Sequence, residues 1–214
     1  SYGGTFIEGW MKKEVIDADA KIAKDCTKIK HKKWAGKESQ LYNANIYPIR
    51  HTTIAGVIWY QGCSNLDDND HYDTMMARMA EQWRKDWGDS KNEMPFYYVM
   101  ITPYSYGNSR AIAYPRFVEC QIRALQLIPN SGMAGSTDIG EEYCIHPAQK
   151  KEVGQRLAAL AMEHRHTSSL EGIIDDDVDC CIRNMTSIGR SGMRETDREI
   201  VKLMLEDRHE TALR

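Results

Sequence analysis

A short segment near residue 60 brings together several side chains that can take part in acyl transfer. Residues 59–65 read Trp-Tyr-Gln-Gly-Cys-Ser-Asn, so an amide, a thiol, a hydroxyl and a second amide surround one glycine. Backbone N–H groups and amide side chains at such a turn can stabilise an oxyanion, which makes Gln61, Gly62 and Asn65 candidates. Cys63 or Ser64 could act as a nucleophile if a histidine served as the base. The segment lacks the Gly-x-Ser-x-Gly elbow, which argues against that interpretation.

His146 is the candidate base. It precedes Pro147 and follows Asp138 by eight residues, in a stretch that we expect to connect a strand to a helix. An imidazole with an ordinary pKa of about 6.5 is poised to take a proton from a hydroxyl near neutral pH. Asp138, Glu141 or Glu142 could orient this imidazole. The spacing fits equally well a loop histidine that caps a helix, with solvated carboxylates around it.

The elements that would position these residues alternate between strands and helices. Apolar runs rich in β-branched and aromatic residues predict strands, and three- and four-residue apolar spacing predicts helices between them. The expected strands cover 53–60, 95–102 and 132–138, and the expected helices cover 70–87, 111–128 and 147–164. This alternation is typical of an α/β fold with a parallel sheet covered on both faces. Ligands of such sheets bind at the carboxyl ends of the strands, where residues 61–65, 102–106 and 138–146 follow.

Composition excludes some classes of protein. The chain has 214 residues, enough for one domain with a small appendage, and a formal net charge of −3, which does not favour nucleic-acid binding. No apolar run approaches the roughly 18 residues that a membrane helix needs. The six cysteines show neither a CxxC pair nor zinc-type Cys/His spacing. We therefore expect small buried cysteines, no metal and no cofactor, and the oligomeric state stays open.

The two ends of the chain differ in character from its middle. Residues 7–33 predict a heavily charged helix whose basic run, 28–33, is expected to be solvated. The stretch 167–214 carries three consecutive aspartates and a Cys-Cys pair, and it offers few apolar anchors. We place a domain boundary near residue 166 and expect the tail 167–214, partly helical or disordered, to pack weakly on the domain 1–166.

Several ordered motifs resemble one known family. They are Ser-Tyr-Gly-Gly-Thr-x-Ile-Glu-x-Trp at 1–10, Leu-Tyr-Asn at 41–43, Trp-Tyr-Gln-Gly-x-Ser-Asn at 59–65, Pro-Phe-Tyr-Tyr-Val at 95–99, Asp-Ile-Gly at 138–140 and Ile-His-Pro at 145–147. In this order they resemble the sialate O-acetylesterase family of SGNH hydrolases, which is related to acetylxylan esterases. The resemblance runs from residue 1 to about residue 166.

The resemblance implies a serine esterase that removes acetyl groups from sialic acid or related sugars. The implied fold is a three-layer α/β/α, flavodoxin-like SGNH sheet, here lacking its first strand. Gly3 and Gly4 would supply an oxyanion N–H, Gln61 a further oxyanion donor and His146 the general base. The implied partner is an acetylated carbohydrate, and the implied location is periplasmic or secreted.

Two departures from the family pattern bear on activity. The family's nucleophile is a serine in a Gly-Gln-Ser-Asn type motif on the first strand, and this sequence has no such segment. Cys63 stands where the family has a glutamate that orients the histidine, and a thiol with a reference pKa near 8.5 is mostly neutral at pH 7. Asp138 is the evident substitute. We therefore expect an N-terminally truncated esterase, inactive or weakly active on its own; a non-catalytic carbohydrate-binding relative or a decayed fragment is the alternative.

Overall fold

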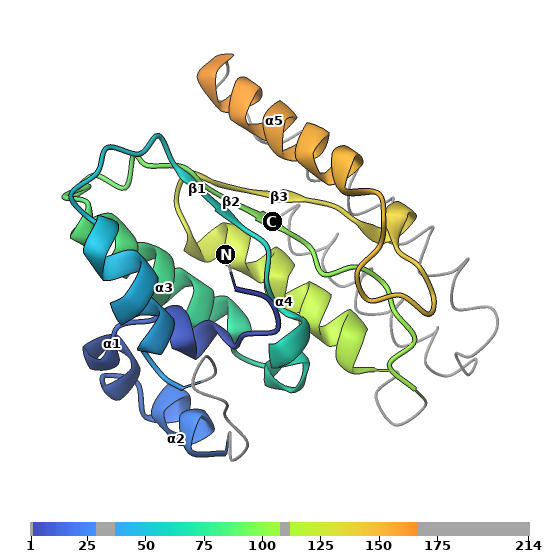
Figure 1. The fold of residues 1–214 in the computed structure, drawn as a ribbon, viewed down its shortest axis with the longest axis horizontal. Helices are drawn as coiled ribbons and strands as arrows, with labels where there is room; N and C mark the ends of the chain where they lie inside the picture. Colours follow the sequence, from blue (N-terminus) through green and yellow to red (C-terminus); the bar gives the residue numbers. More distant parts are fainter. Residues whose placement is uncertain (1, 29–36, 108–111, 167–214) are drawn as a thin grey trace, which may run out of the picture.

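A parallel sheet of three short strands forms the centre of the molecule. The computed structural model describes residues 2–28, 37–107 and 112–166. Strands β1 (Val57–Trp59), β2 (Phe96–Val99) and β3 (Ser131–Ala134) pair in parallel in the order β1-β2-β3. Helices α3 (Tyr72–Asp86), α4 (Ala113–Leu127) and α5 (Lys150–His166) follow the successive strands, as Figure 1 shows. The expected alternation of strands and helices is confirmed, although each strand is shorter than its apolar run.

The sheet lies between two helical layers. Successive residues of a strand point to opposite faces, and in β2 Phe96 and Tyr98 join the larger apolar core, whereas Tyr97 and Val99 join a smaller one. The larger core contains the methionines of α3 and the buried face of α4, and the smaller one contains Val153, Leu157 and Leu160 of α5. Figure 1 shows α5 on one side of the sheet and α3 and α4 on the other. The fold is thus the expected three-layer α/β/α arrangement.

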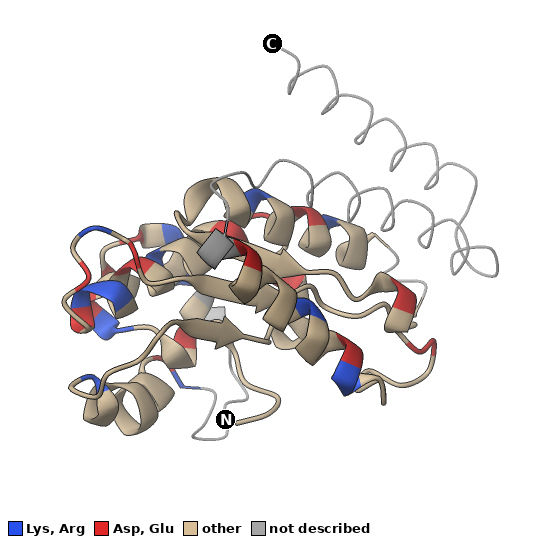
Figure 2. Cartoon of the chain, turned by 90° about the horizontal axis from the view of Figure 1, so that it is seen from above, with Lys and Arg blue, Asp and Glu red and all other residues tan. Residues whose placement is uncertain are grey.

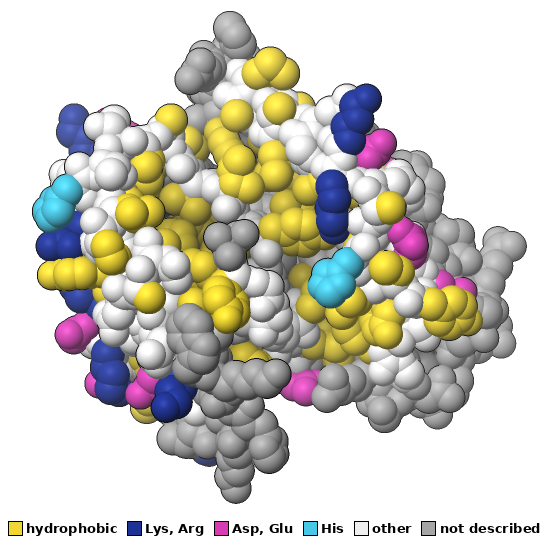
Figure 3. Space-filling model, in the orientation of Figure 1, with side chains coloured by type: hydrophobic (Ala, Val, Ile, Leu, Met, Phe, Trp, Pro, Cys, Tyr) yellow, Lys and Arg dark blue, Asp and Glu magenta, His cyan; other side chains and the backbone are white. Residues whose placement is uncertain are grey.

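Strand β1 forms one edge of the sheet. Among the described strands only β2 pairs with it, and its central residue, Ile58, is 66% exposed. In Figure 1 β1 crosses the middle of the view, and in the same orientation Figure 3 shows hydrophobic side chains gathered in the middle of this face. Within the described part of the chain the outer edge of β1 is therefore unpaired, and its most exposed side chain is apolar.

The segment before the sheet is broken into short helices rather than forming one helix over 7–33. It comprises a 3₁₀ turn (Ile7–Trp10), α1 (Lys13–Asp17) and α2 (Ala20–Lys28). The break after the 3₁₀ turn has a tertiary cause, because the Lys12 N–H donates to Oε1 of Gln82 on α3 at 2.8 Å while Met11 and Lys12 are extended. Asp19 then caps α2 by accepting from the Lys21 N–H at 3.0 Å. The expected basic run lies outside the described residues except for Lys28.

Short turns connect α2 to β1. A π-helical turn (Tyr42–Ile46) and a 3₁₀ turn (Tyr47–Ile49) lie before β1, and a 3₁₀ segment (Cys63–Asp68) follows it. Figure 2 shows acidic and basic residues interspersed over the described elements. Of the helices in the described ranges, none combines the length and the apolar character needed to cross a membrane. The expected tail, 167–214, lies outside the described residues.

Two expectations near the carboxyl end of the sheet are wrong. Strand β3 ends at Ala134, so Asp138 lies in a 3₁₀ turn (Thr137–Ile139) rather than ending a strand. Helix α5 begins at Lys150 and not at Pro147. The reason is a hydrogen bond from a side chain to the backbone. Oε1 of Glu141 accepts from the Ala148 N–H at 2.8 Å and holds this stretch as a loop.

Arg84 of α3 ties together loops at the amino ends of the strands. It is 1% exposed, and its guanidinium donates to the carbonyls of Met94 (3.0 and 2.7 Å) and Pro129 (2.6 Å). We expect Arg84→Met to lower the free energy of unfolding by about 3 kcal/mol, because buried carbonyls lose their donors. Urea titration followed by circular dichroism measures the loss. The exposed neighbour Lys85, changed to Met, should shift stability by no more than about 0.5 kcal/mol, and an equal loss in both variants would contradict this role for Arg84.

Candidate active site at the carboxyl end of the sheet

Gln61, just after β1, is held by hydrogen bonds at every polar atom of its side chain. Nε2 donates to the Thr5 carbonyl at 2.8 Å and to Oδ1 of Asn65 at 2.8 Å, and Oε1 accepts from the Tyr72 hydroxyl at 2.7 Å. An amide NH₂ has two hydrogens, so both are engaged. Gln61 can donate to a substrate oxygen only by exchanging one of these bonds.

Asn65 extends this arrangement into the interior. Its side chain is fully buried; Oδ1 also accepts from the Ile7 N–H at 3.0 Å, and Nδ2 donates to Glu8 Oε2 and to Asp68 Oδ2, both at 2.9 Å. The amide therefore uses its whole hydrogen-bonding capacity. We call Thr5, Glu8, Gln61, Asn65 and Tyr72 the N-terminal clasp. It fastens residues 5–8 to the turn that ends β1.

The clasp positions the turn formed by Gly3 and Gly4. Thr5 supports this turn, since its hydroxyl donates to the Tyr2 carbonyl at 3.2 Å and accepts from the indole N–H of Trp10 at 2.9 Å. Gly4 has a φ of 66°, which favours glycine, and a Cβ built on either glycine meets no atom within 4 Å. The turn is exposed, so a ligand can approach its backbone.

Gly62 is a glycine for reasons of both conformation and space. Its φ is 157°, and a Cβ there would lie 2.5 Å from Cγ2 of Ile101 and 2.7 Å from Cε1 of Phe117. The turn after β1 therefore packs its backbone directly against the segment that follows β2 and against α4. This close packing fixes the backbone at Gly62, which lies between Gln61 and Asn65 in the sequence.

Cys63 sits half-buried among aromatic side chains. Burial raises the pKa of its thiol, and the Tyr106 hydroxyl and the Lys150 charge oppose that rise only in part. Lys150, the first residue of α5, places Nζ 5.2 Å from the centre of the Tyr60 ring. A thiol of raised pKa stays protonated near pH 7, which makes it neither an activated nucleophile nor an anionic partner for a histidine.

His146 lies on the exposed loop that leads into α5. The Cys144 thiol donates to its backbone carbonyl at 3.3 Å, and the Ser105 N–H donates to the Glu142 carbonyl at 2.8 Å, which joins this loop to the segment after β2. Lys150, four residues further on, reaches Tyr60 at the end of β1. The loop of His146 and the turn of Gln61 therefore both lie at the carboxyl edge of the sheet.

Asp138 forms a bidentate pair with Arg156 of α5. Its two carboxylate oxygens accept from Nη1 and Nη2 of Arg156 at 2.6 and 2.5 Å, and Arg156 also donates to the Gly135 carbonyl at 2.7 Å. Hydrogen bonding to this guanidinium lowers the pKa of Asp138. The pair links α5 to the turn that follows β3, and the proposed role of Asp138 in orienting His146 stays a prediction.

Sequence reasoning missed Glu8, Tyr72 and Lys150. Glu8 was visible only as part of the opening Ile-Glu-x-Trp motif, and Tyr72 and Lys150 were assigned to helices. Each acts across a distance in the chain that no local pattern reports, such as the 57 residues between Glu8 and Asn65.

Comparisons with known proteins show the family that the chain is similar to. The family model described as "Carbohydrate esterase, sialic acid-specific acetylesterase" matches residues 1–163. The sialate O-acetylesterase of Mus musculus is 27% identical over 198 residues, which cover 73% of this chain and 37% of the mouse protein. A solved carbohydrate acetylesterase from Xanthomonas citri superposes with a TM-score of 0.64 at 31% identity, covering 76% of this chain and 35% of that one. The chain thus spans well under half the length of these relatives.

A second relationship concerns a short stretch. Over 47 residues, which make up 22% of this chain, the sequence is 60% identical to a UPF0597 protein of Phocaeicola vulgatus, of which the match covers 11%.

Proposed function

Because this chain belongs to the sialic acid-specific acetylesterase family of carbohydrate esterases, we propose that its carboxyl edge is part of a site for hydrolysing acetyl esters of sugars. In this proposal the N–H groups of Gly3 and Gly4 stabilise the oxyanion and His146 is the general base. The observation that carries the proposal is the N-terminal clasp, which fixes the Gly3–Gly4 turn at the edge where the His146 loop also lies.

The proposed chemistry is ordinary acyl transfer by a serine. A serine hydroxyl attacks the acetyl carbonyl, His146 takes the hydroxyl proton, and the carbonyl oxygen becomes an oxyanion that accepts from the turn. When the C–O bond to the sugar breaks, His146 returns the proton to the leaving oxygen. Water then hydrolyses the acetyl-serine by the same path and releases acetate.

Gln61 enters this proposal mainly through position. Both of its N–H bonds are already donated, to Thr5 and Asn65, so it holds the oxyanion turn in place, and it contributes directly only if a substrate oxygen replaces one of these acceptors. Gly62 and Asn65 help to hold Gln61 in place, Gly62 through its close packing and Asn65 through its hydrogen bond to Gln61. Replacing an oxyanion donor typically costs 10²- to 10³-fold in turnover, so precise placement of the turn matters.

The isolated chain is expected to be inactive or nearly so. We expect this because the neutral Cys63 thiol cannot hold an imidazolium as a carboxylate does, and because the sequence contains no Gly-Gln-Ser-Asn motif. Hydrolysis of p-nitrophenyl acetate and of 9-O-acetyl-N-acetylneuraminic acid by the purified chain should not exceed the buffer rate. Activity of the unmodified chain that disappears in Ser64→Ala or Cys63→Ala would place the nucleophile within the turn and overturn this assignment.

A non-catalytic carbohydrate-binding role is the second candidate, and the neutral Cys63 favours it. Adding a segment with the family's serine distinguishes the two candidate functions. An incomplete esterase site would gain activity, whereas a protein that only binds carbohydrate would not.

A further inference from the structure

A cavity of about 680 Å³ lies at the opposite end of the sheet from the candidate active site. Residues 50–55, which precede β1, and 93–95, which precede β2, form two of its walls, and residues 86–89 at the end of α3 form the third. Because the strands are parallel, this is their amino end, whereas Gln61 and the His146 loop follow their carboxyl ends. The cavity therefore shares no residue with the proposed esterase site.

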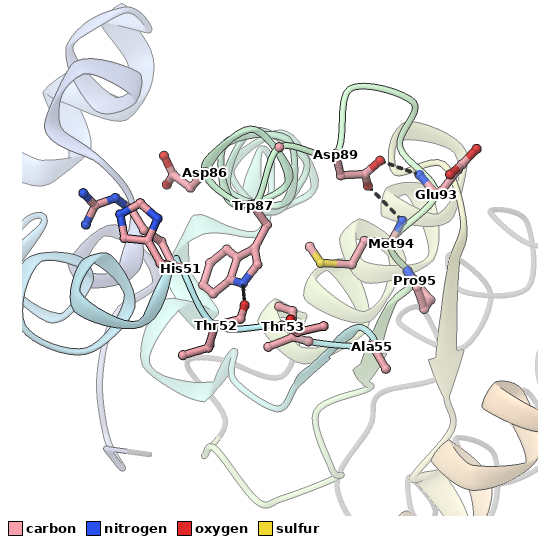
Figure 4. A pocket seen from close by; sticks show the side chains of 13 residues that line it. His51, Thr52, Thr53, Ala55, Asp86, Trp87, Asp89, Glu93, Met94 and Pro95 are labelled. Carbon is pink, nitrogen blue, oxygen red and sulfur yellow. Dashed lines mark hydrogen bonds between the residues drawn. The ribbon is translucent and has the colours of Figure 1, made fainter.

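Trp87 provides a fixed aromatic surface in this cavity. Its indole N–H donates to the Thr52 carbonyl at 2.8 Å, and the partly buried ring packs against the main core. Figure 4 shows the ring among the lining residues, above Thr52 and with His51 and Met94 nearby. An aromatic ring whose orientation is already fixed loses little conformational freedom when a ligand stacks on it.

The acidic groups at the cavity fall into two kinds. Asp86 accepts from the Tyr42 hydroxyl and from Nε2 of Gln82, both at 2.8 Å, and Asp89 accepts from the N–H groups of Glu93 (3.0 Å) and Met94 (2.8 Å). These two carboxylates hold the walls in place. The side chain of Glu93, by contrast, is 73% exposed. Its ion pair with Lys91, at 3.9 Å, is also exposed, so the Glu93 carboxylate can adjust to a ligand.

The basic residues that line the cavity are fewer than the acidic ones. Arg50 is committed to Tyr47, since its guanidinium lies 3.6 Å from the centre of that ring and donates to the Tyr47 carbonyl at 2.6 Å. His51 is exposed and lines the same wall. The three carboxylates of the lining each have a cationic neighbour as well: Asp86 lies 3.9 Å from Lys12 Nζ, Asp89 3.8 Å from Arg84 Nε and Glu93 3.9 Å from Lys91 Nζ. The charges at the cavity are therefore largely balanced, which suits a neutral ligand that carries hydroxyl groups.

We propose that this cavity binds neutral hexopyranose units of a glycan. The apolar C–H face of the sugar stacks on Trp87, and sugar hydroxyls donate to Glu93 and contact His51. A volume of this order accommodates a ligand of a few rings, and an aromatic wall with a small number of polar groups is the usual composition of such pockets. The site would hold a neutral part of a glycan, independently of whether the opposite edge hydrolyses esters.

Binding of methyl β-D-galactopyranoside to the full chain, followed by tryptophan fluorescence and by saturation-transfer NMR, tests the proposal. We expect saturable binding with a Kd of about 1 mM, weakened at least tenfold by Trp87→Ala and about threefold by Glu93→Gln. Glu81→Gln, an exposed change on α3 away from the cavity, is the matched control and should leave the Kd unchanged. If Trp87→Ala fails to fold by circular dichroism, Glu93→Gln and His51→Ala decide the question.

Three results would overturn the proposal. They are the absence of saturable binding, equal affinity in the wild type and the cavity variants, and tighter binding of N-acetylneuraminic acid than of the galactoside. The last result would show that the cavity prefers an anionic sugar. Because no ester is hydrolysed in these measurements, their failure is distinct from a failure of the proposed esterase function.

Discussion

Changing Cys63 to glutamate is expected to raise esterase activity by about 10²- to 10⁴-fold in a chain to which the family's serine segment has been added. The Cys63 thiol is neutral near pH 7, because burial raises its pKa. A glutamate would supply the anionic acceptor that fixes the histidine tautomer and stabilises the imidazolium formed during attack. The measurement is kcat/KM for p-nitrophenyl acetate, with an N-terminal segment carrying Gly-Gln-Ser-Asn present in every variant.

Two control variants test whether the gain depends on the negative charge at residue 63 and on His146. Cys63→Gln adds the same bulk without the charge and should give little of the gain, and His146→Ala should remove the gain entirely. An equal gain from glutamine and glutamate would mean that packing around residue 63, and not an anion, limits the rate. Retention of the gain without His146 would assign the general base to another residue.

Gly62→Ala is expected to cause the largest loss of stability among single changes at the candidate site, about 4 kcal/mol. The new Cβ would lie 2.5 Å from Ile101 and 2.7 Å from Phe117, and the backbone φ of 157° suits glycine alone. Both contacts are with buried side chains, so neither can move aside cheaply. Urea unfolding followed by circular dichroism gives the free energy.

Substitutions at two other glycines separate the cost of the backbone conformation from the cost of the steric contacts. Gly88 also has a positive φ, 75°, but open space around it, so Gly88→Ala should cost only the backbone term of about 1 kcal/mol. Gly154, on α5, has neither constraint, and Gly154→Ala should stabilise the protein by up to about 1 kcal/mol. If Gly62→Ala costs no more than Gly88→Ala, the turn is looser than its contacts indicate.

The sheet and its helices could be predicted because burial leaves a local trace in the sequence. The strands of a parallel sheet are buried on both faces, so β2 reads as a continuous apolar run. The apolar spacing that predicts a helix over 70–87 also marks its buried face, because Met75, Met76, Met79 and Trp83 of α3 are buried. Gly88, with its positive φ, follows α3 where the sequence places its end.

The partners of polar side chains could not be predicted in the same way. Asp138 was expected near His146, yet Arg156 of α5 engages it, because a guanidinium offers a bidentate charged partner that an imidazole cannot match. Glu8 and Asn65 meet only after the chain has folded back across the sheet. Such pairs depend on tertiary geometry, and the spacing of residues in one segment carries no record of it.

The open edge of β1 has a consequence for how the protein behaves in solution. An unpaired strand edge offers a row of backbone donors and acceptors to any extended chain, and here the exposed Ile58 adds apolar surface to it. Most proteins protect such an edge with charge, proline or a covering element, whereas the three residues of β1 are Val, Ile and Trp. Two copies of the chain can therefore associate through the edge of β1.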